Sequence, residues 1–239
     1  LSILGRYPVA ILAGGFDMTA ELAGRLMGYV EQGGTLMLNV EHLGGHFPGT
    51  FLGAELSEEM RSTAEARVAG AVLPCSAHPY RLVKLRGASV VYSAANGDPI
   101  VTRHGVGRGA VLLTAAPYLL TGSGRPVGWL FDLLKELAIE VMPVRVYGDI
   151  EFLVNRLPDG WVVTLVNNKG VVKEPTLPPT VDPTQKALAR IVTPAGVVNA
   201  REWTDDGDRP VDLRGGEIRL DVPPGDLRIV RLVDDGKQR

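Results

Sequence analysis

Apolar and polar residues follow two different patterns along the chain, and the change occurs near residue 142. Residues 8–13 are a short continuous apolar run, which is typical of a strand buried on both faces. A helix follows, with Thr19 or Asp17 as its cap. Its apolar face repeats at helical spacing and consists of Leu22, Leu26, Tyr29 and Val30. A second apolar run at 35–40 completes a strand–helix–strand unit, whose crossover is expected to be right-handed in a parallel sheet.

The rest of the first part is predicted to contain more strands and one more helix. Strands separated by turns at Asn96-Gly97 and at 105–109 are expected at 64–73, 89–93, 99–104 and 110–116. The last helix is predicted to begin at Pro126, a residue suited to the first helical position, and to end near Glu140. Its apolar face consists of Val127, Leu130, Phe131, Leu134, Leu137 and Ala138. Residues 8–142 are therefore expected to form a mostly parallel sheet covered by helices.

After Met142-Pro143 the pattern changes to short strands separated by turns rich in glycine, proline, aspartate and asparagine. These strands are predicted at 144–146, 150–155, 161–167, 187–192, 217–222 and 227–232. Short strands punctuated in this way favour a small antiparallel sandwich. The boundary between the two parts is expected at Met142-Pro143.

Composition and charge exclude several classes of protein. Lys and Arg number 25 against 27 Asp and Glu, so the formal net charge is −2, which argues against a polycationic nucleic-acid-binding arm. No apolar stretch approaches the roughly 20 residues that a membrane-spanning helix needs. The single cysteine, Cys75, excludes an internal disulfide and a multi-cysteine zinc site. Because the chain begins at Leu1 and reaches a predicted core strand almost at once, we expect it to be a piece of a longer polypeptide.

Two phrases in the first part carry a family resemblance. One runs from Tyr7-Pro-Val-Ala-Ile-Leu through a glycine-rich turn and a helix to Tyr29-Val-Glu-Gln-Gly-Gly-Thr-Leu, and the other is Asn96-Gly-Asp-Pro-Ile-Val followed by Gly105-Val-Gly-Arg-Gly. Both are similar to the degenerate class I glutamine-amidotransferase-like domain of bacterial glycoside hydrolases, in particular the trimerisation domain of the family 42 β-galactosidases. The resemblance implies an α/β flavodoxin-like (amidotransferase-like) domain over residues 1–142.

The second part carries the matching resemblance. The phrases Trp161-Val-Val-Thr-Leu-Val-Asn-Asn-Lys-Gly and Pro223-Pro-Gly-Asp-Leu-Arg-Ile-Val resemble the small β-sandwich that closes these enzymes. The resemblance implies a small all-β antiparallel sandwich domain over 143–239. It also implies that the chain is an accessory, oligomerising region, with its catalytic (β/α)8 barrel upstream in the same polypeptide. It implies no cofactor.

Cys75 is the first candidate for catalysis, because working amidotransferase domains use a cysteine–histidine pair. Such a nucleophile needs a lowered pKa and an exposed, tight turn, which small glycines on either side usually provide. Cys75 stands in Leu-Pro-Cys-Ser-Ala, without a flanking glycine and without a helical pattern after it. His78 is close enough in sequence to contact the thiol. The competing interpretation is a packed thiol with no chemical role.

The segment 41–51 is the second candidate, because it follows a predicted parallel strand at the edge where open α/β sheets bind ligands. Glu41, His42 and His46 are residue types that bind zinc, although no fourth ligand is evident. Phe47 and Phe51 make the loop apolar, as in an interface between subunits. The alternative is that both rings fold back onto their own sheet.

Three further motifs have simple structural interpretations. The segment 105–109 looks like a phosphate-binding loop, but it lies between two predicted strands instead of before a helix, so a hairpin turn is favoured. The acidic pairs at 58–59 and 205–206 favour solvated turns over a glycosidase pair or a calcium loop. Trp203 lies among polar residues and is the one tryptophan that suits a platform for stacking on a sugar.

Two hypotheses of function follow from the sequence. The preferred one is a non-catalytic accessory and oligomerisation region of a multidomain, β-galactosidase-like glycoside hydrolase. The alternative is a self-contained carbohydrate-binding protein or amidotransferase-like enzyme that uses Cys75 and His78 or the loop at 41–46. The expected partners are the upstream catalytic domain, further copies of the chain and carbohydrate, and the sequence predicts no metal-binding set.

Overall fold

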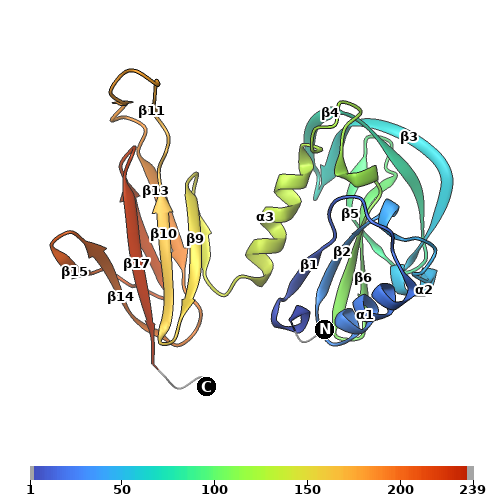
Figure 1. Cartoon of the computed structure of the whole chain (residues 1–239), viewed down its shortest axis with the longest axis horizontal. Helices are drawn as coiled ribbons and strands as arrows, with labels where there is room; N and C mark the ends of the chain where they lie inside the picture. The colour runs from blue at the N-terminus through green and yellow to red at the C-terminus, as the bar shows by residue number, and fades with distance from the viewer. Residues whose placement is uncertain (1–2, 236–239) are drawn as a thin grey trace. The chain divides into compact units, whose positions relative to one another are not determined.

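The computed structural model describes residues 3–235 of the chain. The chain divides into two compact units, Leu1–Val141 and Met142–Arg239, each with its own hydrophobic core. Strands dominate both units, and no sheet contains strands from both (Figure 1). No helix within residues 3–235 is long and apolar enough to cross a lipid bilayer.

A seven-stranded mixed sheet forms the centre of the first unit (Figure 1). Its order is β1 (Val9–Ile11), β2 (Thr35–Asn39), β7 (Gly109–Thr114), β6 (Pro99–Val106), β5 (Ser89–Ala94), β3 (Ala54–Val68) and β4 (Ala71–Leu85). Only the pairs β1–β2 and β2–β7 are parallel, and the other four pairs are antiparallel. The mostly parallel, flavodoxin-like sheet expected from the sequence is therefore not found. Short turns join β3 to β4, β5 to β6 and β6 to β7, and each of these pairs is antiparallel, because a parallel pair needs a long crossover.

The helices partly follow the sequence pattern. Helix α1 (Ala20–Glu31) is the predicted crossover, and the Thr19 side chain caps it by accepting a hydrogen bond of 3.2 Å from the Leu22 amide. Helix α3 (Trp129–Val141) begins three residues after Pro126, and Phe131 is exposed on it. The residues that α3 buries are Trp129, Leu133 and Leu137, of which only Leu137 belongs to the predicted face. The other helical segments are short: η1 (Leu4–Arg6), η2 (Val40–His42), α2 (Gly49–Leu52) and η3 (Pro117–Leu119).

The strand predicted at 64–73 is instead the tip of a long hairpin formed by β3 and β4. The chain reverses at Ala69 and Gly70, both with left-handed φ angles of 47° and 85°. Alternating apolar residues continue across this turn, so the pattern alone does not reveal the reversal. The hairpin lies at one edge of the sheet, next to β5 (Figure 1).

The contact between α1 and the sheet depends on glycines. A β-carbon added to Gly109 would lie 2.2 Å from the Gly34 carbonyl oxygen and 2.3 Å from that of Val30. At Gly34, the added carbon would lie 2.1 Å from the Tyr29 ring. The glycine-rich segment between β6 and β7 is thus a hairpin turn that lets a helix end and a strand approach closely, as the sequence favoured over a phosphate loop.

The second unit contains antiparallel sheets only. The larger one has the order β15 (Gly207–Pro210), β14 (Val197–Thr204), β17 (Leu227–Asp234), β10 (Gly160–Val166) and β9 (Glu151–Leu157). The smaller one has the order β16 (Glu217–Val222), β13 (Ala187–Val192) and β8 (Arg145–Tyr147). Both contribute to one apolar core, an arrangement compatible with the predicted sandwich.

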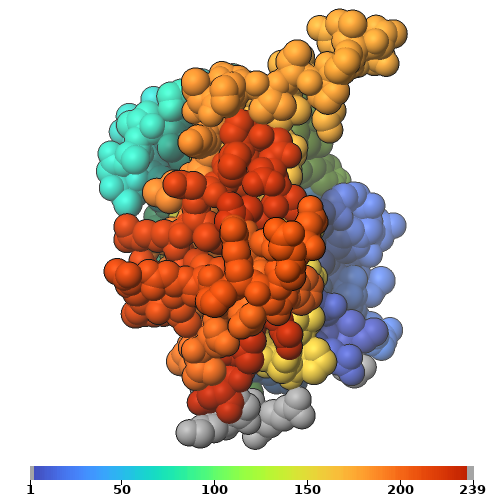
Figure 2. All heavy atoms as spheres, turned by 90° about the vertical axis from the view of Figure 1, so that its left-hand side faces the viewer, coloured from blue at the N-terminus to red at the C-terminus, as the bar shows by residue number. Residues whose placement is uncertain are grey.

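A short hairpin of β11 (Val171–Val172) and β12 (Thr180–Val181) projects away from these two sheets (Figure 1, Figure 2). The sequence pattern did not predict this hairpin. It also did not predict β14 and β15. In each of these segments polar residues, prolines or glycines interrupt the apolar alternation that marks a strand.

Replacing Gly109 by Ala is expected to lower the free energy of unfolding of the first unit by about 1–3 kcal/mol, since the new methyl group would overlap two carbonyl oxygens. The matched control is Gly24→Ala in α1, where the added methyl group meets no atom within 4 Å. That change is expected to stabilise the helix by about 0.5–1 kcal/mol. Urea denaturation of both variants measures the difference, and equal effects would show that the close approach is unimportant.

Candidate functional site

The buried side-chain amide of Asn39 joins the loops that follow the parallel strands. Its Nδ2 donates to Thr114 Oγ1 at 3.1 Å and to the Ala116 carbonyl oxygen. Its Oδ1 accepts hydrogen bonds from the backbone amides of Glu41 and Tyr118, each at 3.0 Å. Asn39 ends β2, whereas Thr114 ends the neighbouring strand β7. One side chain therefore holds two loops together at the carboxyl edge of the sheet, where open α/β sheets bind ligands.

His42 lies in the middle of this edge and is 2% exposed. Its Nδ1 accepts a hydrogen bond of 3.4 Å from the Asn39 amide, so Nε2 carries the proton and donates to the Gly14 carbonyl oxygen at 2.8 Å. Both ring nitrogens are thus occupied, and His42 has none left for a metal. Within residues 3–235, no group of three or more His, Cys, Asp or Glu side chains is placed to hold a metal ion. The zinc interpretation of Glu41, His42 and His46 has no support in this geometry.

Two aromatic side chains surround His42 and form the exposed part of this edge. Phe16, which is 37% exposed, stacks on the His42 ring with centroids 4.9 Å apart. Tyr118, which is 48% exposed, contacts the same ring edge-on at 6.2 Å. Beside them Glu41 forms a half-buried ion pair with Arg81 at 3.5 Å. We call these five residues the edge surface.

The backbone at Tyr118 is strained. Tyr118 and Leu119 have left-handed φ angles of 48° and 59°, a conformation that two consecutive non-glycine residues rarely adopt. The Asn39 side chain holds the Tyr118 amide, and the Val127 amide donates to the Leu119 carbonyl oxygen at 2.9 Å. Strain of this kind costs about 1–3 kcal/mol per residue and tends to occur at functional sites. Here it places an exposed tyrosine beside Phe16.

Phe47 and Phe51 do not belong to this exposed surface. Both rings are buried in the core of the first unit and stack on each other with centroids 5.7 Å apart. The sequence prediction of an apolar, exposed loop at 41–51 is therefore corrected: its phenylalanines pack against their own sheet, and His46 is its exposed side chain of chemical interest. The packing satisfies the hydrophobic effect within the unit, so these rings are not available to a partner.

Cys75 lies within strand β4, and its thiol is 3.7 Å from His78 Nδ1. The Trp129 indole N–H donates to His78 Nε2 at 3.2 Å, so the His78 proton is on Nδ1, which donates to the Ser76 carbonyl oxygen at 3.0 Å. Neither nitrogen is free to take a proton from the thiol. Burial, with a smaller effect of the Glu65 charge, raises the pKa of Cys75, and burial lowers the pKa of His78. The pair is a neutral packing contact with no activated nucleophile.

Trp203 lies on β14 in the second unit and is 41% exposed. It is among the residues that line a hollow of about 400 Å³ at the end of β14 and the start of β17. The hollow is lined by Glu202, Trp203, Thr204, Asp205, Arg209, Asp226, Leu227, Arg228 and Ile229. By strand register the Trp203 side chain points to the face of the sheet opposite to Glu202, Arg209 and Arg228.

Glu202, 3% exposed at its side chain, is the buried charge at the base of this hollow. It accepts hydrogen bonds from Arg209 at 2.6 Å and from Arg228 at 2.9 Å. Burial raises the pKa of Glu202, but the hydrogen bonds from Arg228 and Arg209 outweigh burial and hold the pKa below its ordinary value. The carboxylate therefore stays ionised and fixes both guanidinium groups.

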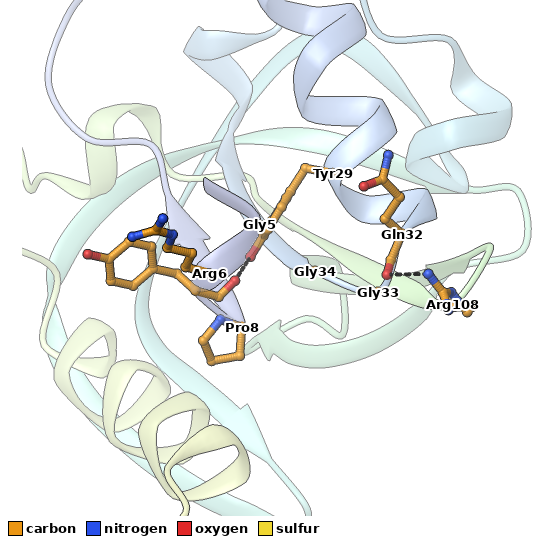
Figure 3. A pocket seen from close by; sticks show the side chains of 9 residues that line it. Gly5, Arg6, Pro8, Tyr29, Gln32, Gly33, Gly34 and Arg108 are labelled. Atoms are coloured by element: carbon orange, nitrogen blue, oxygen red, sulfur yellow. Dashed lines mark hydrogen bonds between the residues drawn. The ribbon is translucent and has the colours of Figure 1, made fainter. Parts of the chain in front are cut away.

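Another hollow, of about 410 Å³, lies in the first unit at the amino end of the parallel strands (Figure 3). Two of its polar groups are paired: the Tyr29 hydroxyl donates to the Tyr7 carbonyl oxygen at 2.9 Å, and Arg108 donates to that of Gln32 at 3.0 Å. Helix α1 ends here, and the carbonyl end of a helix disfavours anions. The pocket consequently shows no feature of a phosphate site.

No protein-family model matches the chain, and no curated protein matches it in sequence. Its fold does match solved structures. A β-galactosidase of Bacillus circulans sp. alkalophilus superposes with a TM-score of 0.61 at 14% identity, over 95% of this chain and 33% of that one. A catalytic mutant of Gan42B, a GH42 β-galactosidase of G. stearothermophilus, gives 0.59 at 16%, over 96% and 32%. The α-L-fucosidase isoenzyme 2 of Paenibacillus thiaminolyticus gives 0.59 at 12%, over 96% and 41%.

Both units of the chain, in order, therefore share their fold with part of these glycoside hydrolases. At such identities the likeness concerns the fold alone. The chain spans about a third of the length of the β-galactosidases that it matches.

Sequence reasoning missed the residues that organise both sites. Asn39 follows an apolar strand, a position at which an asparagine usually caps a helix or turn. Its partners Thr114 and Tyr118 are more than 70 residues away, so the sequence gives no sign of the contact. Phe16 and Tyr118 lie in loops that no local pattern connects. Glu202 and Arg228 are likewise distant in sequence and meet only because β14 pairs with β17.

Replacing Asn39 by Leu is expected to lower the free energy of unfolding of the first unit by roughly 2–5 kcal/mol, because four hydrogen bonds are lost and buried amides remain without acceptors. Thr114→Val removes only one of these partners and is expected to cost about 1–2 kcal/mol. Denaturation measures both values, and hydrogen exchange should accelerate at the Tyr118 amide in the Asn39 variant alone. Equal losses in the two variants would contradict the role of Asn39.

Alkylation of Cys75 by iodoacetamide tests whether its thiol is activated. Because the pKa of Cys75 is raised, the thiolate fraction at neutral pH is below that of a free thiol, and the rate should still be rising beyond about pH 8.5, the ordinary pKa. His78→Gln is expected to leave this profile in place, since His78 is no base for the thiol. A plateau near neutral pH that disappears in the His78 variant would reveal an ion pair and restore the catalytic interpretation.

Proposed function

We propose that the chain is a non-catalytic accessory and oligomerisation region of a multidomain glycoside hydrolase that resembles the GH42 β-galactosidases. The observation that carries the proposal is the match of both units, in order, to about a third of those enzymes. In this proposal residues 1–142 correspond to a degenerate amidotransferase-like domain and residues 143–239 to the closing β-sandwich. The catalytic barrel lies upstream in the same polypeptide.

The site geometry supports a role without catalysis by this region. The Cys75 thiol has a raised pKa and no base, because Trp129 and Ser76 occupy both nitrogens of His78. This geometry disfavours the alternative of an amidotransferase-like enzyme. The alternative that uses the loop at 41–46 is disfavoured as well, because backbone groups occupy both nitrogens of His42.

We assign self-association to the edge surface of the first unit. Aromatic residues are frequent at the centres of interfaces, and Phe16 and Tyr118 are both exposed and both contact the His42 ring. Tyr118 is held in a strained, left-handed conformation. A contact between copies offers a reason for this strain, because it would use the exposed ring. With Phe47 and Phe51 buried, the edge surface replaces them as the proposed interface.

The variant Tyr118→Gly distinguishes a role of Tyr118 in self-association from a role in the stability of the fold. Glycine adopts the left-handed conformation without penalty, so the variant is expected to be as stable as the unmodified chain or more stable by about 1 kcal/mol. At the same time it removes the ring, so the mass measured by light scattering should fall toward that of the 25.6 kDa monomer. Phe16→Ser is likewise expected to lower the mass measured by light scattering.

Phe131→Ser is the matched control, because Phe131 is also an exposed aromatic residue of the first unit but lies on α3. The mass of the Phe131→Ser variant in light scattering should equal that of the unmodified chain. A monomeric unmodified chain, or an unchanged oligomer in both edge-surface variants, would contradict the assignment. Hydrolysis of an aryl β-galactoside by the chain, lost in Cys75→Ser, would contradict the non-catalytic role.

A further inference from the structure

We propose that Glu41 of one copy of the chain pairs with Arg81 of a second copy, so that opposite charges align the edge surfaces of the two copies. This inference rests on the proposed self-association and deepens it, because it names the groups that make the edge surface complementary to itself. Three observations carry it: a weak ion pair within the chain, polar atoms without partners, and the fixed position of both charges.

The ion pair between Glu41 and Arg81 is weak within one copy. Arg81 Nη2 lies 3.5 Å from Glu41 Oε1, beyond the usual range of N–H···O distances. In the same unit Arg103 donates to both oxygens of Glu140, at 2.8 Å and 2.6 Å, which is the forked geometry that arginine and a carboxylate prefer. Glu41 and Arg81 do not reach this geometry with each other.

Both side chains have unused capacity for hydrogen bonds. A guanidinium group carries five N–H donors, yet within residues 3–235 neither Nη1 nor the buried Nε of Arg81 has an acceptor. Glu41 Oε2 likewise accepts no hydrogen bond from the described part of the chain. The side chains are 24% and 27% exposed, so each is partly removed from water and still accessible. A half-buried charge of this kind is stabilised by a close, opposite charge.

The fold holds both charges in fixed positions. Asn39 Oδ1 accepts from the amides of Glu41 and Tyr118, so one side chain fixes the acidic residue relative to the exposed tyrosine. The Arg81 amide donates to the Ala115 carbonyl oxygen at 3.0 Å, which attaches β4 to the loop that carries Tyr118. Groups that are already in place lose little entropy when a partner binds.

The charges of the edge surface fit a second copy of the chain. The surface holds one carboxylate and one guanidinium group beside two exposed aromatic rings. A strongly acidic or basic partner would meet a like charge here, whereas a second copy that places Glu41 against Arg81 meets opposite charges. In a two-fold contact this pairing occurs twice, because residue i contacts residue j and residue j contacts residue i. The rings then supply apolar burial, and the charges supply orientation.

Charge reversal tests the pairing. Glu41→Arg and Arg81→Glu each place like charges where the copies meet, and each is expected to raise the dissociation constant of self-association at least about tenfold. An equimolar mixture of the two variants restores opposite charges between copies, although like charges remain within each copy. Light scattering over a range of concentrations should therefore give a higher mass for the mixture than for either variant alone. A mixture that keeps the mass of the separate variants would overturn the proposal.

Glu41→Gln is a milder variant, which removes the charge without placing a like charge at the contact. It is expected to weaken self-association less than Glu41→Arg does. Because salt screens opposite charges, added NaCl should raise the dissociation constant of the unmodified chain more than that of Glu41→Gln. An equal salt dependence of the two chains would contradict the pairing.

Glu55→Arg is the matched control, since it changes the net charge by the same amount as Glu41→Arg. Glu55 forms an exposed ion pair with Arg86 at 2.9 Å, at the base of the hairpin of β3 and β4, and does not belong to the edge surface. Its reversal should leave the mass unchanged. Circular dichroism confirms that each variant is folded.

The results distinguish this proposal from self-association itself. If Tyr118→Gly lowers the mass but both charge reversals leave it unchanged, the edge surface is an interface and the charge pairing is wrong. If the unmodified chain is monomeric, self-association fails and the pairing fails with it. If Glu55→Arg lowers the mass as much as Glu41→Arg does, the effect is one of overall charge, and the proposal is equally overturned.

Discussion

The structure of the first unit depends on one buried side-chain amide. Asn39 uses both its donor and its acceptor to connect the ends of β2 and β7 with the loops that follow them. Since an unpaired amide in the core would cost about 1–3 kcal/mol, the chain can hardly rearrange this edge without losing stability. The edge surface is therefore rigid, although it consists of loops. Rigidity lowers the entropy that a contact must overcome, which suits a docking surface.

The same unit keeps parallel pairs of strands at one side of an otherwise antiparallel sheet. The β1–α1–β2 crossover and its pairing with β7 place loops at the carboxyl edge. The cysteine, however, lies in the edge hairpin of β3 and β4, where its neighbour His78 serves as a hydrogen-bond acceptor for Trp129. A histidine that is buried, neutral and fully hydrogen-bonded contributes to packing. In this way the tertiary contacts determine which hydrogen bonds the two residues make, which their types alone do not reveal.

In the second unit, a buried ion cluster takes the place of the buried amide and holds neighbouring strands together. Glu202 is buried between two arginines on neighbouring strands, so its negative charge is compensated where the strands β14, β15 and β17 meet. Removing either arginine would leave a buried charge without full compensation, and this couples the local order of three strands. The first unit fixes its edge with neutral hydrogen bonds, and the second fixes its hollow with an ion cluster.

The sequence by itself determined the features that depend on neighbouring residues. The Thr19 cap, helix α1, the strands β1 and β2 and the hairpin turn before Gly109 follow from local spacing and turn residues, although β1 is an edge strand that is not buried on both faces. The charge balance and the single cysteine equally excluded several classes of protein. Only the tertiary structure decided the direction of β3 to β7, the burial of Phe47 and Phe51, and the pairing of Asn39 with Tyr118. These features join residues that are far apart in sequence, and the physical terms that fix them, burial and hydrogen-bond satisfaction, act only once the chain is folded.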